Sequence, residues 1–309
     1  MNATFRFHTL DVFTDRRFGG NPLAVFSDAR GLGEAFMQPI ARELNLSETV
    51  FVLPPRDPRA LCRLRIFTPG RELPFAGHPT VGTGHLLATL GRIPGDHARG
   101  EATACMLLEE DVGLVPVTVS LRDGRPRFVQ LSAAALPSGG PEAPSRTALA
   151  AMLSLAAEDI LDGADAPRAL SCGVPFMFVP LRDRGALARA RLDIDRWRTT
   201  LERHWANQVF LFCRDPELPG SSIRARMFAP EMGVIEDPAT GAACAALAGY
   251  LGPREARADG TAKWIVEQGF EMGRPSLIHV EADLRDGAVT AVRVGGTSVM
   301  VSEGELRLD

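Results

Sequence analysis

The strongest constraint on the fold of this chain is a segment that occurs twice. The first copy reads Arg65-Ile66-Phe67-Thr68-Pro69 and continues, after a short loop, with His78-Pro79-Thr80-Val81-Gly82. The second reads Arg226-Met227-Phe228-Ala229-Pro230 and continues with Asp237-Pro238-Ala239-Thr240-Gly241. Each copy runs on into an apolar stretch that reads as a helix. We therefore expect two similar half-molecules, each offering one helix N-terminus and one ionisable group to a shared cleft.

Further landmarks follow the same order in both halves. Gly20-Asn21-Pro22 parallels Gly173-Val174-Pro175, and the apolar run 50–53 parallels 209–212. The offsets lie between 153 (173 minus 20) and 161 (228 minus 67), about half of the 309 residues. This period favours a duplicated domain over a solenoid of short repeats. The alternative is coincidence, because Gly-x-Pro sequences and short apolar strands are common.

Length and composition exclude several classes of protein. A chain of 309 residues can form two domains, each with its own core. The net charge of -4 and pI near 5.9 give no electrostatic reason to bind nucleic acid. No apolar run could span a bilayer, and residues 1–15 lack the apolar core of a signal peptide. We therefore expect a cytoplasmic protein with no membrane or nucleic-acid partner.

The residues that common cofactors require are missing or misplaced. The five cysteines are scattered without a CxxC pair, which predicts buried thiols in a reducing compartment and no metal site. Lys263 is the single lysine, so a Schiff base with pyridoxal phosphate would depend on an accident of position. The glycines of 77–82 have phosphate-loop spacing, but Thr83 stands where that loop needs lysine. We predict that the protein uses no cofactor.

The hydrophobic pattern predicts an α+β fold in which strands dominate. Two apolar helices, Pro79–Thr89 and Ala239–Leu251, are rich in small residues, as suits a helix enclosed by a sheet. Each half would be a mostly antiparallel curved sheet or barrel around its helix, making two pseudo-symmetric domains. The segment Ala133 to Ser145 is the best linker, which divides the chain into residues 1–132 and 133–309, with the last strand free to pack back on the first half. The other expected elements are strands at 5–12, 22–27, 49–53, 63–68, 112–121, 127–131, 176–181, 209–213, 225–228, 277–282, 289–294 and 298–303, and helices at 32–44 and 146–157.

The two helix starts are candidate anion sites. The first N–H groups of a helix have no partner inside it and carry partial positive charge, so they can hold a carboxylate without lysine or arginine. The candidate substrate-binding residues are Gly77, Pro79, Gly82, Thr240, Gly241 and Ala242. Asp237 could instead be only an N-cap, and a lone His78 is more often a structural histidine. Their matching positions in the two copies favour a catalytic function for both.

Glu48 is the third candidate catalytic residue. It precedes an apolar strand, and its counterpart at an offset of 159 (207 minus 48) is Asn207. A glutamate on one side only would make a duplicated site asymmetric, as proton transfer requires. A carboxylate half-buried against an apolar wall has a raised pKa and can take and return a proton. The alternative, which spacing alone favours, is an ordinary exposed glutamate at a strand edge.

The chain resembles the phenazine biosynthesis PhzF-like family, which has the diaminopimelate epimerase-like fold. The stretches that carry the resemblance span nearly the whole chain: Asp11-Val12-Phe13-Thr14, Gly20-Asn21-Pro22-Leu23-Ala24-Val25, Asn45-Leu46-Ser47-Glu48-Thr49, Phe67-Thr68-Pro69, Leu73-Pro74-Phe75-Ala76-Gly77-His78-Pro79-Thr80, Phe228-Ala229-Pro230, Glu236-Asp237-Pro238-Ala239-Thr240-Gly241, Met272-Gly273-Arg274-Pro275-Ser276 and Val294-Gly295-Gly296. The resemblance implies that Glu48 is the proton shuttle, that His78 and Asp237 assist it, and that the protein is a homodimer.

The family's named reaction isomerises a dihydro-hydroxyanthranilate by moving a proton between ring carbons without a cofactor. Related epimerases use a thiol from each half, and Gly77 and Asp237 look like the positions where those thiols would stand. Cys244 lies nearby, but no cysteine occupies either position, which disfavours a thiol-based epimerase. Ala242 replaces a serine that is frequent in the family, so the phenazine precursor itself is in question as the substrate.

These observations predict a cofactor-independent isomerase that moves a carbon-bound proton on a small carboxylate-bearing substrate by general acid–base catalysis at Glu48. Two alternatives remain open. One is an epimerase or racemase of a small amino or hydroxy acid, and the other is a non-catalytic protein that binds a small ligand. The sequence leaves open the functions of Gln268, Arg274 and Tyr250, for which a structural role is favoured.

Overall fold

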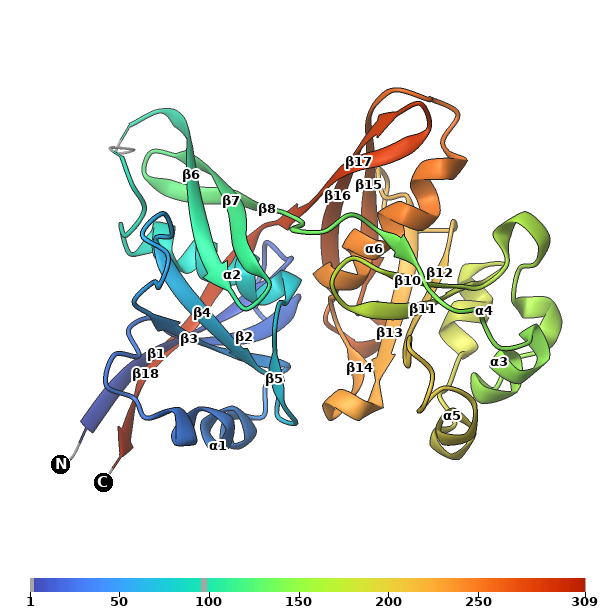
Figure 1. Ribbon diagram of the computed structural model, residues 1–309, viewed down its shortest axis with the longest axis horizontal. Coiled ribbons are helices and arrows are strands. Elements are labelled where there is room, and N and C mark those ends of the chain that lie inside the picture. The colour runs from blue at the N-terminus through green and yellow to red at the C-terminus, as the bar shows by residue number, and fades with distance from the viewer. Residues whose placement is uncertain (1–2, 96–98, 309) are drawn as a thin grey trace. The chain divides into compact units, whose positions relative to one another are not determined.

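The computed structural model describes residues 3–95 and 99–308. The chain divides into two compact units, unit 1 with residues 1–134 and 294–309, and unit 2 with residues 135–293. Figure 1 labels the elements of both.

Unit 1 is a mixed sheet with two helices. Its elements are β1 (Ala3–Val12), β2 (Asn21–Phe26), α1 (Glu34–Leu44), β3 (Glu48–Leu53), β4 (Cys62–Phe67), β5 (Glu72–Leu73), α2 (Gly77–Thr89), β6 (Glu101–Glu110), β7 (Gly113–Arg122), β8 (Arg125–Ser132) and β18 (Ser298–Leu308). β1 pairs antiparallel with β18 and β2, so the two ends of the chain meet in one sheet. β2 then pairs parallel with β3, β3 antiparallel with β4, β4 antiparallel with β5 and parallel with β6, and β7 antiparallel with β6 and β8.

Unit 2 repeats this order of strand pairing. Its strands are β9 (Ser138–Gly139), β10 (Arg168–Ser171), β11 (Pro175–Pro180), β12 (Gln208–Cys213), β13 (Ile223–Ala229), β14 (Val234–Asp237), β15 (Gly260–Gln268), β16 (Ser276–Arg285) and β17 (Ala288–Gly296), of which β17 crosses the boundary between the units. β10 pairs antiparallel with β9 and β11, and β11 pairs parallel with β12. β12 pairs antiparallel with β13, β13 antiparallel with β14 and parallel with β15, and β15 antiparallel with β16. Antiparallel pairs dominate, but each unit also contains parallel pairs, so the sheets are mixed.

The helices of unit 2 are α3 (Arg146–Met152), α4 (Arg184–Arg189), α5 (Ile194–Thr200) and α6 (Gly241–Leu251). Short 3₁₀ turns lie at Ala157–Asp159, Gly163–Asp165, Pro230–Met232, Gly252–Arg254 and Phe270–Met272. Four predicted helix bounds are wrong. α1 begins at Glu34 and not at residue 32, and α2 begins at Gly77, two residues before the predicted Pro79. α3 ends at Met152 and not at residue 157, because Ser154 takes a left-handed φ of 57° that stops the helix. α6 begins two residues after the predicted Ala239, with Thr240 as its N-cap.

Each unit encloses one apolar helix. α2 contacts β1, β2, β3, β7, β8 and β18, and α6 contacts β10, β11 and β16 (Figure 1). Nearly every residue of both helices is buried, so neither has a polar face. Small residues permit this close approach: a Cβ atom on Gly82 would lie 2.6 Å from Leu23 Cδ2 and 2.7 Å from Val12 Cγ2.

An arginine–glutamate pair fastens the hairpin that leads to each enclosed helix. Arg65 on β4 binds Glu72 on β5 through hydrogen bonds of 2.6 and 2.8 Å. Arg226 on β13 binds Glu236 on β14 through hydrogen bonds of 2.7 and 2.9 Å. Because the guanidinium group presents two parallel N–H donors to both carboxylate oxygens, each pair fixes direction as well as distance. The chain therefore enters α2 and α6 from defined positions.

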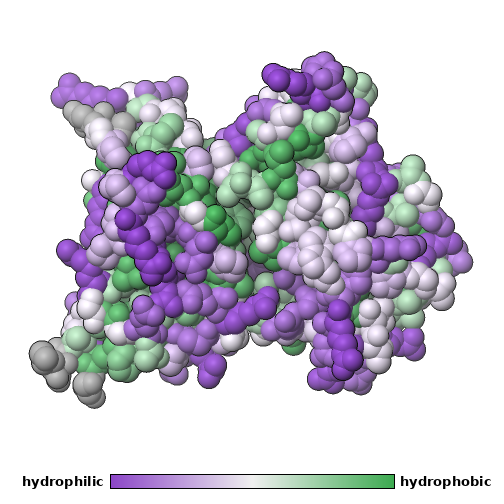
Figure 2. Space-filling model, in the orientation of Figure 1, coloured by the Kyte–Doolittle hydropathy of each residue, from purple (hydrophilic) through white to green (hydrophobic). Residues whose placement is uncertain are grey.

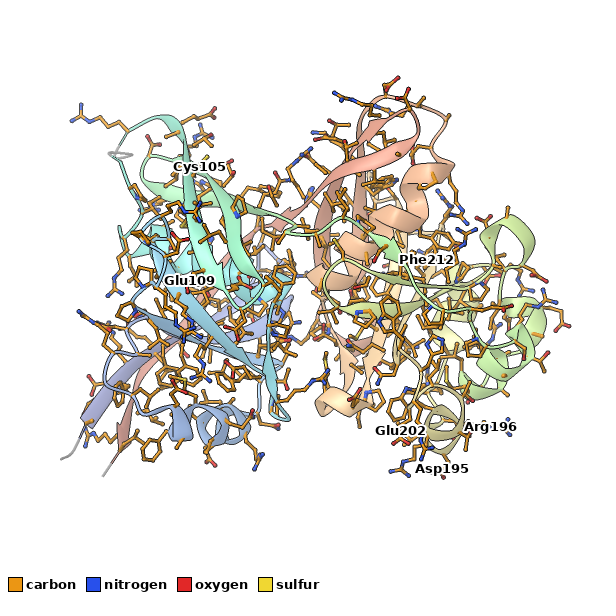
Figure 3. All side chains as sticks on the ribbon, in the orientation of Figure 1. Cys105, Glu109, Asp195, Arg196, Glu202 and Phe212 are labelled. Atoms are coloured by element: carbon orange, nitrogen blue, oxygen red, sulfur yellow. The ribbon has the colours of Figure 1, made fainter. Side chains whose placement is uncertain are left out.

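The surface is mainly hydrophilic. Figure 2 shows hydrophilic residues over much of the visible face, with smaller groups of hydrophobic residues among them. On α5, Asp195 and Arg196 lie at the outer surface (Figure 3), and Arg198 donates a 3.0 Å hydrogen bond to Asp195. Among the described residues, no helix is both long and apolar enough to cross a membrane.

We predict that Gly82→Ala destabilises the protein by about 1–3 kcal/mol, because the new methyl group must displace the packed side chains of Leu23 and Val12. Urea denaturation measures the free energy of unfolding. Gly139→Ala is the control, since a Cβ atom there meets no atom within 4 Å. Equal stability of the two variants would contradict this packing.

Candidate active site

The structure brings two of the three predicted catalytic residues of this chain into contact within unit 1. Glu48 is the first residue of β3, and His78 is the second residue of α2. His78 Nε2 lies 3.1 Å from Glu48 Oε2, and the exposed fractions of the two side chains are 4% and 13%. Glu48 is therefore not the ordinary exposed glutamate that spacing alone favoured.

His78 is a neutral imidazole at pH 7. Burial lowers its pKa to about 3, and a backbone hydrogen bond with Pro22 opposes that shift only in part. The positive end of the α2 dipole acts in the same direction as burial. Proline has no N–H, so the Pro22 carbonyl accepts this hydrogen bond and a ring nitrogen of His78 donates it.

The position of the single ring proton constrains the contact with Glu48. Nε2 of His78 has no other partner, so Nδ1 is the nitrogen that donates to Pro22. A neutral imidazole has only one N–H, so Nε2 presents a lone pair. The 3.1 Å distance to Glu48 Oε2 is short, but Nε2 is not aligned as a hydrogen bond within the described residues. A proton on Glu48 would place a donor within reach of this lone pair.

The first turn of α2 supplies backbone donors beside this pair. Ala76 is the N-cap, and the N–H groups of Gly77 and His78 fall in the first turn, where they have no acceptor inside the helix. Pro79 has no N–H. Gly82 is the sixth helical residue, beyond the first turn, and its missing side chain permits the packing described above. Gly77 and His78 are thus the donors in this turn that could face an anion.

Unit 2 holds the third candidate, Asp237, at the end of β14. Its side chain is 8% exposed, and Thr240 Oγ1 donates a 2.5 Å hydrogen bond to its Oδ2. Thr240, not Asp237, is the N-cap residue of α6. Gly241 and Ala242 are the first two residues of that helix. Asp237, Thr240, Gly241 and Ala242 therefore lie together in unit 2.

Gln268 fixes this loop, a function that the sequence did not reveal. It is fully buried at the end of β15, where its Oε1 accepts the N–H of Thr240 at 3.0 Å. Its Nε2 donates to the Asp237 carbonyl at 2.7 Å and to Thr240 Oγ1 at 2.9 Å. Gly269 follows with φ +78°, and a Cβ atom there would lie 2.5 Å from the Pro238 carbonyl oxygen. The approach of two backbone segments explains this glycine.

Two other residues that the sequence left open now have positions. Tyr250 is buried in α6, with its ring edge-on to Phe212 and its hydroxyl donating to the Ala166 carbonyl at 3.3 Å. Arg254 lies over the same ring at 3.8 Å, so Tyr250 packs the core of unit 2. The Ser276 hydroxyl donates to the carbonyl of Arg274 at 3.1 Å, which places Arg274 in the turn before β16.

Thiol chemistry has little support in this structure. Burial raises the pKa of the Cys244 thiol far above its usual range, so this residue is not a thiolate at neutral pH. Burial also raises the pKa of Cys62 to about 12. Within residues 3–95 and 99–308, no three His, Cys, Asp or Glu side chains gather as a metal site.

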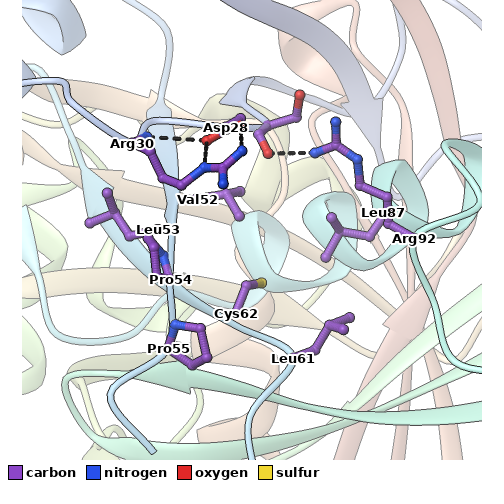
Figure 4. Close-up of a pocket in the computed structure, with 11 residues that line it drawn as sticks. Asp28, Arg30, Val52, Leu53, Pro54, Pro55, Leu61, Cys62, Leu87 and Arg92 are labelled. Atoms are coloured by element: carbon purple, nitrogen blue, oxygen red, sulfur yellow. Dashed lines mark hydrogen bonds and ion pairs between the residues drawn. The ribbon is translucent and has the colours of Figure 1, made fainter. Parts of the chain in front are cut away.

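A separate pocket in unit 1 lies between β3, β4 and the end of α2 (Figure 4). Its volume is about 310 Å³, and Asp28, Arg30, Cys62 and Arg92 are among its lining residues. Arg30 binds Asp28, and Arg92 donates to the Ser27 carbonyl, so both guanidinium groups already have acceptors. This pocket shows no chemistry that matches the pair of Glu48 and His78.

Comparison with known proteins identifies the family. The model of the phenazine biosynthesis-like protein family matches residues 10–304, and the chain belongs to this family. An uncharacterized isomerase of Mesorhizobium japonicum is 42% identical over 302 residues, which cover 96% of each chain. The trans-2,3-dihydro-3-hydroxyanthranilate isomerase of Pseudomonas aeruginosa is 35% identical over 98% of this chain and 99% of its own. These relatives place the protein among the isomerases.

A solved structure shows the same fold. The phenazine biosynthesis protein of the PhzF family from Bacillus anthracis superposes with a TM-score of 0.86 and 28% identity, covering 98% of this chain and 99% of its own. The resemblance stated from the sequence motifs is therefore confirmed.

We predict that buried His78 makes the protein sensitive to acid. The folded-state pKa near 3 lies below the ordinary 6.5, so between these values the unfolded chain binds one more proton than the folded chain. This group therefore costs about 1.4 kcal/mol of stability for each pH unit below 6.5. In His78→Gln, urea denaturation should show a flatter loss of stability between about pH 6.5 and pH 4. An unchanged slope would contradict a neutral, buried His78.

We also predict that Gln268→Leu destabilises unit 2 by about 2–4 kcal/mol, because it removes three buried hydrogen bonds to the loop that carries Asp237. Gln268→Glu keeps the acceptor for the Thr240 N–H and, where the new carboxyl group is ionised, loses the donors, so at alkaline pH it reports the contribution of the donors alone. Thermal denaturation of both variants measures the effect. Wild-type stability in Gln268→Leu would show that the amide does not hold this loop.

Proposed function

We propose that this isomerase moves a carbon-bound proton on a small carboxylate-bearing substrate, without a cofactor, and that Glu48 is the general acid and base. The main support is the contact between Glu48 and the buried His78. Because His78 is a neutral imidazole, its Nε2 can face the proton that Glu48 would carry, and the proposed transfer needs no positively charged side chain. The relatives named as trans-2,3-dihydro-3-hydroxyanthranilate isomerases catalyse a reaction whose name fits this chemistry, and that compound is the first substrate to test.

The proposed reaction returns every proton that it removes. The Glu48 carboxylate takes a proton from one substrate carbon, and the electron pair of that C–H bond enters the conjugated system. The C–C double bonds shift, and the O–H of Glu48 then gives the same proton to another carbon. His78 accepts a hydrogen bond from Glu48 while the glutamate is protonated, which holds the proton in place between the two transfers.

The substrate carboxylate would be held by backbone N–H groups. In this proposal, the N–H groups of Gly77 and His78 in the first turn of α2 bind the anion. Gly82, whose N–H lies beyond that turn, stays a candidate through the close packing that its missing side chain permits. In unit 2, Asp237, fastened by Thr240, and Gly241 at the start of α6 stay candidate residues. The proposal also includes two pseudo-symmetric units, each of which supplies one helix N-terminus. It further includes a homodimer and a location in the cytoplasm.

We predict that Glu48→Gln lowers kcat/KM by about 10²–10⁴-fold and leaves the fold intact, because the amide cannot take up or return the proton. Turnover of trans-2,3-dihydro-3-hydroxyanthranilate, followed by absorbance, measures the rate, and circular dichroism checks the fold. Glu109→Gln is the control, since this glutamate accepts the backbone N–H groups of Arg56 and Asp57 at a loop (Figure 3). Near wild-type turnover by Glu48→Gln would end the assignment.

The reaction in D₂O separates the candidate functions. We predict that the hydrogen lost from one carbon is found at another carbon of the product, and that deuterium stands there only for turnovers in which the O–H of Glu48 exchanges with solvent, as an isomerase with one shuttling group requires. Deuterium at one stereocentre with inversion would favour an epimerase or racemase. Binding of the compound without any exchange would favour a non-catalytic ligand-binding protein. Mass spectrometry and proton NMR of the recovered compound distinguish these outcomes.

A further inference from the structure

Glu110 is a buried carboxyl group that the proposed mechanism does not use. It is the last residue of β6, and its side chain is 3% exposed. It contacts the start of α2 at two points: Thr80 Oγ1 lies 2.5 Å from its Oε1, and the backbone N–H of Ala76, the N-cap, also bonds the carboxyl group. Its second oxygen, Oε2, is buried without a partner. The neighbouring Glu109 faces a loop instead, as alternation along a strand requires.

The protons around Thr80 can be counted. Thr80 Oγ1 lies 2.7 Å from the Ala76 carbonyl and 2.5 Å from Glu110 Oε1, but a hydroxyl has one hydrogen to donate. If Glu110 were ionised, two acceptors would compete for that hydrogen and one of these short contacts would lack a proton. If Glu110 is protonated, its O–H donates to Thr80, and Thr80 donates to the Ala76 carbonyl. The protonated form therefore gives each of the two contacts a hydrogen of its own, whereas the ionised form would make both share one.

Unit 2 contains the neutral counterpart of this group. Arg63 on β4 aligns with Glu109 on β6, and Arg224 on β13 aligns with Glu267 on β15, both in parallel pairs. The residues that follow are Glu110 and Gln268, separated by 158 positions (268 minus 110). Glu267 also matches Glu109, because it accepts the backbone N–H groups of Glu217 and Leu218.

Gln268 makes the same kinds of contact as Glu110. It accepts the N–H of the N-cap residue of α6, Thr240, and donates to a threonine hydroxyl. An amide group donates from its nitrogen and accepts at its oxygen. A carboxyl group can do both only when it is protonated. The corresponding position of the other unit is therefore occupied by a residue that is always neutral.

Among residues 3–95 and 99–308, the charged and titratable groups around Glu110 include no cation that binds it. Asp111 is its neighbour on β6, and Arg63 on β4 binds Asp111 at 3.2 Å. Cys62 on β4 is a thiol whose pKa is raised by burial, so it is uncharged at neutral pH. α2 contributes two titratable groups, His78 and His85, and burial lowers the pKa of both. Burial, with a smaller contribution from Asp111, raises the pKa of Glu110 to about 8.

We propose that Glu110 is a positioning residue that works in its protonated form, in which it holds the first turn of α2, and with it His78, as Gln268 holds the loop of Asp237. Ionisation of Glu110 places a buried negative charge behind the N–H groups that bind the substrate carboxylate, and it breaks the chain of hydrogen bonds through Thr80. The affinity for an anion then falls. This inference rests on the proposed function for the assignment of the anion to the first turn of α2.

The protonation state is tested by thermal denaturation of the wild type, Glu110→Gln and Glu109→Gln between about pH 5 and pH 9.5. The folded-state pKa of Glu110 near 8 lies above the ordinary 4.5, so between these values the folded chain binds one more proton than the unfolded chain. The wild type therefore loses about a factor of ten in its folding constant for each pH unit from 4.5 to 8, and no more above. The advantage of Glu110→Gln should widen over this window and then stay constant. A constant difference throughout, or the same widening in Glu109→Gln, would overturn the proposal.

Carboxyl ¹³C NMR of the wild type supplies a measurement that needs no variant. The Glu110 carboxyl signal should shift between about pH 7 and pH 9 and should be that of a protonated acid below this range. A signal that is already that of a carboxylate at neutral pH would contradict the proposal, whether or not Glu110→Gln folds.

The link to the site is tested by binding of 3-hydroxyanthranilate, an aromatic acid that cannot react, measured by calorimetry. For the wild type and Glu109→Gln, Kd should rise at least about threefold between pH 7 and pH 9.5, while for Glu110→Gln it should stay within about twofold. Equal pH dependence in all three proteins would refute the link. If the proposed function fails, Glu48→Gln keeps its activity while the denaturation result stands. If only the present inference fails, Glu48→Gln is inactive and Glu110→Gln denatures in parallel with the wild type.

Discussion

The structure depends on the enclosure of one helix by a sheet in each unit. A helix that is buried along its length buries its first turn as well, and the N–H groups there have no partners within the helix. In each unit, one side chain at the end of a strand bonds to the start of the helix. It is Gln268 on β15 in unit 2, and in unit 1 it is Glu110 on β6, whose pKa is raised by burial. These side chains bond the N-cap residue and leave the N–H groups of the following residues for a ligand. In the proposed function, the anion site is thus a by-product of enclosing the helix, and would need no arginine or lysine.

Charged pairs beneath the helices make these first turns rigid. Arg65 with Glu72, and Arg226 with Glu236, close the hairpin that precedes each helix. Because removing one partner of a buried ion pair costs several kcal/mol, these pairs restrain the hairpins that lead to the helices of His78 and Asp237. A general base must stay within hydrogen-bonding distance of its proton, and this rigidity serves that requirement.

The sequence predicted much of the fold because its signals are local. Apolar stretches marked α2 and α6, and alternation marked most strands, although β5, β6, β9, β10, β14 and β15 were not predicted. Of these, β6 and β15 end in the residue that fastens a helix, and the offset of 158 between Glu110 and Gln268 was the signal that could have revealed them. The contact of Glu48 with His78 could not be derived from spacing, because it depends on the parallel register that sets Glu48 beside Leu23 on β2. The family motifs, and not the periodicity, identified this glutamate. Gly82 was a candidate because it holds the same place in its copy of the repeat as Gly241. α2 begins before its proline, Pro79, whereas α6 begins after its proline, Pro238. The N–H of Gly82 therefore lies beyond the first turn.

The electrostatics of the buried groups explain why a carboxylate, rather than a thiol, suits proton transfer in this chain. Burial disfavours any charged form, and for the thiol of Cys244 this raises the pKa far above neutrality, so a thiolate base would be scarce. Burial also keeps His78 neutral, so the imidazole can serve as an acceptor but adds no positive charge. In the proposed function, Glu48 would take up and return a proton beside this neutral imidazole. A neutral partner suits that task, because a fixed positive charge in its place would favour the carboxylate over the acid and oppose the uptake of a proton.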